Sequence, residues 1–388
     1  MEESTSGDSL HRPLTYIPLD IIPETILCRL PIKSLLRFRC ICKPWDSLIS
    51  KDLKFAKKHL RVSPKRQHVV TTTWSIANLL TVMSCPFDSL NLHSIFDSKY
   101  THLEHSPIIS TIDDGLVASC DGILCFAIDH RLAILYNPCI KKVKKLPSID
   151  LPQKKGSTLF AFGYDPFIDN YKVVALFWYK YDFNFGTYKT QANVYSYTLG
   201  TNSWKRIKDF PFLPWFSGLG MSKHGIFVSG TVNWLAYHQS NGHAINVSSQ
   251  CIVSLHLGKE SYQEIPLPDF GNSKMLTLEV MRDCLCLSSL KSPKSYFDVW
   301  LMKEYGNKES WTKLFRLPYY DGFSYGFLTN IIYISEDDNH VLLVFTEKGK
   351  FRWVVYDFKN NTTKSSETQD DLDMLKAKVY VESLIWPS

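Results

Sequence analysis

Histidines and carboxylates supply most of the catalytic bases and metal ligands in proteins, so their spacing is the first question for this chain. His102 and His105 are three residues apart, a spacing that on one helix would let both imidazoles bind a metal ion. Pro107 follows closely, which favours a loop over a helix. The other histidines form no HExxH or HxH pairing. We therefore expect no metal site.

Paired carboxylates could act as the acid and base of a glycosidase. Asp113-Asp114 and Glu336-Asp337-Asp338 are such groups, but both lie in predicted turns, where aspartate commonly bonds to nearby backbone. The sequence contains no GxSxG, GxxxxGK[ST] or GxGxxG motif for a nucleophile, a nucleoside triphosphate or a dinucleotide. We therefore expect no enzyme activity and no cofactor.

The ten cysteines include no CxxC pair, the spacing most typical of zinc-binding cysteines. The first ten residues, MEESTSGDSL, are acidic and polar and do not resemble a secretory signal. No apolar run approaches the roughly 18 residues of a membrane-spanning helix. These features predict reduced cysteines that pack as small apolar side chains, no membrane association, and a cytoplasmic or nuclear location.

Charge is concentrated in one short segment. The whole chain of 388 residues carries a net charge of only +6, too weak to indicate a nucleic-acid-binding protein. Residues 16–62 alone contain ten Lys or Arg and four Asp or Glu, while residues 1–15 are acidic. The basic run KKVKK at 141–145 lies on a predicted strand edge, where lysines discourage edge pairing. We therefore expect no nucleic acid partner, but an acidic protein partner for residues 16–62.

Apolar residues in that segment recur at helical spacing. A first predicted helix covers residues 22–30 and ends at Pro31. Ser34 is positioned to cap a second helix, which Pro44 stops, and a third apolar stripe starts at Trp45. Three short helices in about 45 residues cannot build a sizeable core of their own. A partner is therefore expected to cover their apolar surface.

From residue 69 onward, short strands alternate with turn residues, and one phrase recurs: a strand, a turn and a short strand that closes on Leu-Pro or Phe-Pro. It occupies residues 134–147, 194–211, 252–268 and 299–318, and a fifth copy at 354–366 lacks the proline. Strand pairs with a central turn lie before each phrase, so each unit holds about four strands. The repeat predicts an all-β propeller of about six blades, with residues 378–386 completing the first blade.

The stretch RLPIKSLLRFRCICKPW, residues 29–45, closely resembles a plant F-box. The later phrases GLVASCDGILCF, LYNPCIKK, FGYDPFIDNYKVV and YVESLIWP resemble the F-box-associated, kelch-like domain of the same plant family, including the pollen S-locus F-box proteins. The resemblance implies a small all-α F-box at 16–62, after a disordered leader at 1–15. It implies an all-β kelch-like propeller that binds substrate at 63–388.

F-box proteins bind the Skp-type adaptor of cullin-RING ubiquitin ligases, and their C-terminal domains select the substrate. The resemblance thus implies a non-catalytic substrate-recognition subunit of an SCF-type ligase, with an unidentified protein as its target. One alternative is a kelch-like scaffold that binds proteins without directing their degradation. A propeller that binds a glycan or a small molecule is a more distant alternative.

Two sets of residues are candidates for binding. We expect the adaptor to contact Pro18, Ile26, Leu30, Pro31, Leu35, Ile41 and Trp45, some of which must instead hold the helices together. We expect aromatic rim loops at 179–188, 210–216 and 319–325 to bind the substrate, unless they plug the propeller core. Their candidate residues are Tyr181, Phe183, Phe185, Trp215, Tyr319, Tyr320 and Phe323. We expect Trp204 and Trp311, by contrast, to pack between blades.

Overall fold

The computed structural model describes residues 21–74, 80–88, 91, 93, 95, 101–102, 115–184, 187–214, 224–238, 250–269, 275–290, 296–317, 327–347, 350–367 and 375–386. The chain divides into two compact units between Pro64 and Lys65. We call them the helical unit and the propeller unit. No helix among the described residues is both long and apolar enough to cross a lipid bilayer.

The helical unit is built from short helices. Its elements are a π-helical turn η1 (Ile22–Ile26), a 3-10 turn η2 (Leu27–Arg29), α1 (Ile32–Phe38), α2 (Lys43–Lys51) and α3 (Leu53–Val62). Two predicted boundaries are wrong. Ser34 lies inside α1, because Pro31 occupies the position before the helix. Pro44 lies in the first turn of α2, which starts at Lys43, and does not stop a helix, since a proline in the first turn forfeits no helical hydrogen bond.

Among the described residues of the helical unit, the core contains one polar residue, His59, which is 2% exposed. Its Nε2 lies 2.8 Å from the carbonyl oxygen of Leu30. Because a carbonyl oxygen can only accept, Nε2 carries a proton and donates this hydrogen bond. The Asp52 side chain accepts a hydrogen bond from the Phe55 backbone N–H at 3.0 Å and caps α3. The buried apolar residues are Leu27, Cys28, Ile32, Leu35, Ile49, Phe55 and Ala56.

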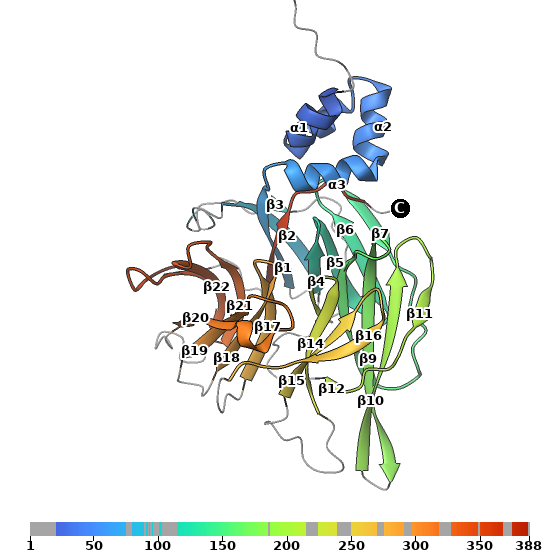
Figure 1. Ribbon diagram of the computed structural model, residues 1–388, viewed down its shortest axis with the longest axis vertical. Helices are drawn as coiled ribbons and strands as arrows, with labels where there is room; N and C mark the ends of the chain where they lie inside the picture. The colour runs from blue at the N-terminus through green and yellow to red at the C-terminus, as the bar shows by residue number, and fades with distance from the viewer. Residues whose placement is uncertain are drawn as a thin grey trace, which may run out of the picture. The chain divides into compact units, whose positions relative to one another are not determined.

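The propeller unit consists of six antiparallel sheets, which confirms the predicted six blades (Figure 1). In sequence order its strands are β1 (Gln67–Trp74), β2 (Leu80–Phe87), β3 (Thr101–His102), β4 (Gly115–Cys120), β5 (Ile123–Asp129), β6 (Leu132–Asn137), β7 (Lys142–Lys145), β8 (Gly156–Asp165), β9 (Asn170–Asn184), β10 (Thr187–Thr198), β11 (Trp204–Arg206), β12 (Leu213–Pro214), β13 (Ile226–Val228), β14 (Thr231–Tyr237), β15 (Gln250–His256), β16 (Ser261–Ile265), β17 (Met275–Met281), β18 (Cys284–Leu290), β19 (Phe297–Met302), β20 (Trp311–Leu317), β21 (Phe327–Ile334), β22 (His340–Glu347), β23 (Lys350–Asp357), β24 (Thr362–Glu367) and β25 (Leu375–Val381). A 3-10 turn, η4 (Lys308–Ser310), precedes β20.

Each predicted strand pair and the phrase that follows it form one blade. The second blade has the order β4-β5-β6-β7, and the third, fifth and sixth repeat this meander. The fourth has an additional strand, because β12 pairs with the end of β14 while β13 pairs with its start. Residues 142–145 of the basic run form β7, the last strand of its sheet, and Lys141 lies in the turn before it, as predicted for a strand edge.

The first blade joins the two ends of the propeller unit. The C-terminal strand β25 pairs antiparallel with β1, with Val381 opposite Gln67. The sheet order β25-β1-β2-β3 therefore makes the last strand of the chain the first strand of this blade, as predicted. The Glu382 N–H then donates to the carbonyl oxygen of Arg66 at 2.9 Å, which extends the closure by one more hydrogen bond.

Aromatic residues of the recurring phrase tie neighbouring blades together. Trp204 donates from Nε1 to the carbonyl oxygen of Pro147 at 2.7 Å, and Trp311 donates to that of Pro266 at 2.9 Å. Each bond runs from a blade to the proline that closes the phrase of the preceding blade. The prediction that these tryptophans pack between blades is confirmed. All ten cysteines are free thiols.

Candidate protein-docking surfaces

The helical unit exposes a disproportionate share of the apolar surface. Among the described residues, eight large apolar side chains are exposed, and four of them belong to this small unit: Ile21, Ile26, Ile41 and Val62. Ile41 is the most exposed of the four, at 60%. Exposed apolar groups on a small module are typical of protein-binding surfaces.

The predicted adaptor residues differ in how available they are. Ile26 and Ile41 are exposed, at 40% and 60%. Leu30, Pro31 and Trp45 are half-buried and still reach the surface of the unit. Leu35 is completely buried, so it belongs to the residues that hold the helices together. Pro18 lies outside the described residues.

Ile41 is held in place by the turn between α1 and α2. The Arg39 Nε donates to Asp46 Oδ1 at 2.8 Å, and the Ser50 hydroxyl donates to the same oxygen at 2.8 Å. Hydrogen bonds from Arg39 and then Ser50 lower the pKa of Asp46, because they stabilise its carboxylate. The rings of Phe38 and Trp45 also meet across this turn, with their centroids 5.9 Å apart. These contacts stabilise the turn that carries the exposed Ile41 side chain.

The same unit is strongly basic. Its described residues 21–64 contain ten Lys or Arg against three Asp or Glu. One acid, Glu24, already pairs with Lys58. Lys54 and Arg61 on α3 remain exposed. An excess of cations around exposed apolar side chains fits a partner with an acidic surface.

The described strand ends beside the three predicted substrate loops lie at one face of the propeller. In an antiparallel meander, the second strand ends, the third begins and the fourth ends at the same face. Asn184 ends the second strand of its blade, and Leu317 ends the fourth of another. Pro214 pairs with Ala236 near the end of β14, also a second strand. We call this side the loop face; β9 and β10 end there as a long hairpin (Figure 1).

The predicted substrate side chains themselves are not described. Tyr181 and Phe183 belong to β9, but their side chains lie outside the described part. The residues Phe185, Trp215, Tyr319, Tyr320 and Phe323 also lie outside the described residues. Their role in binding, and the alternative that they plug the propeller core, stay predictions.

The innermost strands of five blades line a cavity of about 110 Å³ on the propeller axis. Lys378 on β25 and Glu279 on β17 form an ion pair there, with Nζ 3.5 Å from Oε2. Ligand pockets for drug-sized molecules usually measure roughly 300–1,000 Å³. This cavity therefore gives no support to a small-molecule-binding propeller.

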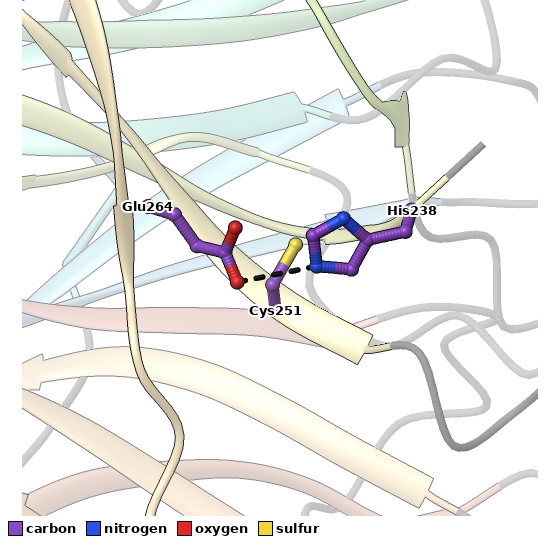
Figure 2. A group of neighbouring side chains, drawn as sticks. All are labelled: His238, Cys251 and Glu264. Carbon is purple, nitrogen blue, oxygen red and sulfur yellow. Dashed lines mark hydrogen bonds and ion pairs between the residues drawn. The ribbon is translucent and has the colours of Figure 1, made fainter.

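A further polar group lies on the loop face. Cys251 and Glu264 lie on the neighbouring strands β15 and β16 of the fourth blade, and His238 directly follows β14. Their side chains point toward one another (Figure 2). The residues are spaced 13 apart along the chain, so a search for close pairs cannot find them. The sequence does contain a signal for this group. Equal spacing along a meander of similar strands brings residues to the same end of neighbouring strands.

Comparison with known proteins agrees with this division of the chain. The F-box domain family matches residues 24–57, and the F-box associated beta propeller domain family matches residues 77–386. The F-box/kelch-repeat protein At3g23880 of Arabidopsis thaliana is 30% identical over 382 residues, which cover 96% of each chain. The F-box protein CPR1 of the same plant is 28% identical over 392 residues, covering 96% of this chain and 89% of its own. The chain therefore belongs to the plant F-box proteins that carry an F-box-associated β-propeller domain.

Proposed function

We propose that this protein is the substrate-recognition subunit of an SCF-type cullin-RING ubiquitin ligase. Its helical unit binds a Skp-type adaptor, and its propeller binds the protein to be ubiquitinated. The observation that carries the proposal is the pairing of an F-box, with exposed apolar and basic residues, with a separate six-bladed propeller. The proposed location is the cytoplasm, the nucleus or both.

The proposed mechanism is positioning. A receptor that holds its target near the ubiquitin-charged subunit raises the local concentration of acceptor lysines, which converts a bimolecular encounter into an intramolecular one. The covalent chemistry of ubiquitin transfer belongs to other subunits. This chain contributes affinity and orientation.

The adaptor contact follows from what the helical unit leaves uncovered. Fully burying an exposed apolar side chain contributes roughly 1.5–3 kcal/mol, and Ile41, at 60% exposed, still has more than half of its surface to bury. The surrounding cations steer an acidic partner toward this surface and increase the association rate. Exposed apolar groups supply the affinity, and the basic groups supply the steering.

The proposed substrate surface is the loop face of the propeller. Loops that project from a rigid scaffold commonly carry binding residues, and Tyr, Trp and Phe are enriched in the energetic centres of protein interfaces. The loops at 179–188, 210–216 and 319–325 share this face and contain such residues. We place the target protein there.

The adaptor contact can be tested by co-expression with a Skp-type adaptor and measurement of one-to-one copurification. We expect Ile41→Asp to abolish copurification, because it would bury an unpaired charge. Phe167→Asp is the matched control, since Phe167 is 66% exposed but belongs to the propeller. Circular dichroism serves to check that both variants are folded. Failure of the wild-type chain to bind any Skp-type adaptor would overturn the proposal.

A second measurement separates a ligase receptor from a scaffold. Proteins trapped by the wild-type chain are added to a reconstituted cullin-RING ligase, and ubiquitin conjugation is followed. A receptor predicts conjugation that depends on Ile41. Stable binding without conjugation would favour the scaffold.

A further inference from the structure

Three potential metal ligands converge where the fourth blade meets the loop face. His238 follows the end of β14, Cys251 lies near the start of β15, and Glu264 lies near the end of β16. The register explains the meeting, because Ala236 pairs with Cys251 and Val253 pairs with Glu264. One rigid sheet thus presents all three groups.

The distances between the three ligand atoms approach those of a metal site. His238 Nε2 lies 3.2 Å from Glu264 Oε1, and all three ligand atoms lie within 4.8 Å of one another. Bonds from zinc to sulfur, nitrogen and oxygen of about 2.0–2.3 Å place tetrahedral ligand atoms about 3.3–3.6 Å apart. A separation of 4.8 Å must therefore shorten by about 1 Å to reach this spacing.

We propose that His238, Cys251 and Glu264 form a zinc-binding site. Thiolate, imidazole and carboxylate are all established zinc ligands, and a borderline-soft cation suits this mixture better than calcium or magnesium, which prefer oxygen ligands. Three protein ligands leave a fourth coordination position. The side chains of His238 and Glu264 are 49% and 42% exposed, so solvent fills that position.

The charge balance is compatible with the location. Binding displaces one proton, from the Cys251 thiol to solvent, and the Sγ atom gives up its long hydrogen bond of 3.7 Å to the Ala236 carbonyl oxygen. In the metal-free protein the His238 Nε2–H donates to the Glu264 carboxylate, so on metal binding the neutral ring moves this proton to Nδ1 and binds through Nε2. The thiolate and the Glu264 carboxylate then neutralise the divalent ion. Cys251 is only 1% exposed, so the sheet shields this thiolate from other thiols and oxidants.

The competing explanation is an ordinary surface pair. His238 and Glu264 would then share a hydrogen bond, while Cys251 would only fill space in the core beside Val253 and Trp234. This explanation predicts no metal affinity. It also predicts that substitutions of His238 and Glu264 remove only their shared hydrogen bond. The proposal does not depend on the ligase role.

The test uses the full chain with Cys40→Ser and Cys42→Ser, because these two exposed thiols could bind metal on their own. Metal-free protein is titrated with cobalt(II) alone, and then with zinc alone to displace it. We expect one equivalent of cobalt, with a thiolate-to-cobalt absorption band in the near ultraviolet and the visible bands of tetrahedral cobalt. Zinc abolishes both.

The variants assign the ligands. Cys251→Ser removes the thiolate band, while Cys125→Ser, a buried thiol on another blade, leaves it unchanged. His238→Gln and Glu264→Gln each raise the dissociation constant at least about tenfold, the cost of losing even an outer partner of a metal ligand. His256→Gln in the same blade is their control. These exposed positions keep the test decisive if Cys251→Ser does not fold. Absence of the band in the starting protein, or binding unaffected by His238→Gln and Glu264→Gln, overturns the proposal.

Discussion

The side-chain amide of Asn137 donates a hydrogen bond to the carbonyl oxygen of Ser383 at 3.0 Å, across 246 residues of sequence. The same amide donates to Ile385 at 2.9 Å, and its oxygen accepts from the Cys139 N–H at 2.9 Å. Asn137 is fully buried. One side chain of the second blade therefore satisfies the backbone of the segment that follows the closing strand β25.

The Gly122 position depends on this C-terminal segment. Its φ of +80° suits glycine, and a Cβ atom there would lie 2.3 Å from Ser383 Cβ. Gly306 has a similar φ of +83°, but a Cβ atom would meet nothing within 4 Å. Gly306→Ala therefore tests the backbone strain alone, and Gly122→Ala adds a clash with the C-terminal segment.

We expect Gly306→Ala to lower the free energy of unfolding by about 1–2 kcal/mol. Gly122→Ala should cost about 1–3 kcal/mol more, the usual penalty of overpacking. Urea unfolding of both variants measures the difference. Equal losses would show that the C-terminal segment yields to the added methyl group.

The sequence predicted the repeating parts of the fold well and the local exceptions poorly. A four-strand unit repeated along the chain must stack into blades, so blade number and closure followed from counting phrases. Within the phrase FGYDPFIDNYKVV, Asp165 and Lys172 form an ion pair with a nitrogen-to-oxygen distance of 2.9 Å. Lys172 also donates to the Leu257 carbonyl oxygen, so the phrase joins two blades.

The errors arose where one residue has two possible roles. Proline both ends helices and starts them, so Pro44 could not be assigned from its type alone. Apolar residues at helical spacing include both core and surface positions, so Leu35 and Ile41 looked alike until burial separated them. The group of His238, Cys251 and Glu264 depends on strand register, which spacing along the chain does not reveal.

Trp311 and Trp234 give a matched test of hydrogen bonds between blades. Trp311 donates to Pro266, whereas the indole N–H of Trp234, also buried, meets no acceptor among the described residues. Trp→Phe removes the same atoms at both sites. We expect Trp311→Phe to lower the free energy of unfolding by about 1 kcal/mol more than Trp234→Phe, as measured by thermal or urea unfolding. This difference is the net value of one hydrogen bond together with the cost of leaving the Pro266 carbonyl oxygen without its donor. Equal effects would mean that packing alone joins these blades.

Asp298 makes part of the stability dependent on pH. Burial alone would raise its pKa, but hydrogen bonds from Arg316 and Lys313 outweigh burial and lower it. The Arg316 pair is bidentate, at 2.7 and 3.1 Å. A lowered pKa in the folded state stabilises the protein above the unfolded value of about 3.9. That contribution disappears as the pH falls from there through the lower folded pKa.

We therefore expect Asp298→Asn to cost about 1 kcal/mol at neutral pH, a small value because Arg316 is half-exposed to screening solvent. The gap between the variant and the wild type should close progressively below about pH 4. Urea unfolding across acidic pH measures it, with the exposed Asp150→Asn as control. A gap that stays constant with pH would mean that Asp298 contributes through packing and not through its charge.

The basic helix α3 allows the steering of the proposed adaptor to be separated from its affinity. Lys54 and Arg61 are exposed on α3, so reversing both charges leaves the core of the helical unit unchanged. Lys54→Glu with Arg61→Glu should slow association with the adaptor by on the order of tenfold at low salt, with little change in the dissociation rate. Raising the salt concentration should shrink the difference, because exposed charges are screened. Stopped-flow or surface-binding kinetics measure both rates, and Lys303→Glu on the propeller is the control. If the double reversal changed the dissociation rate instead, these two residues would lie inside the interface, and α3 would contribute to affinity directly.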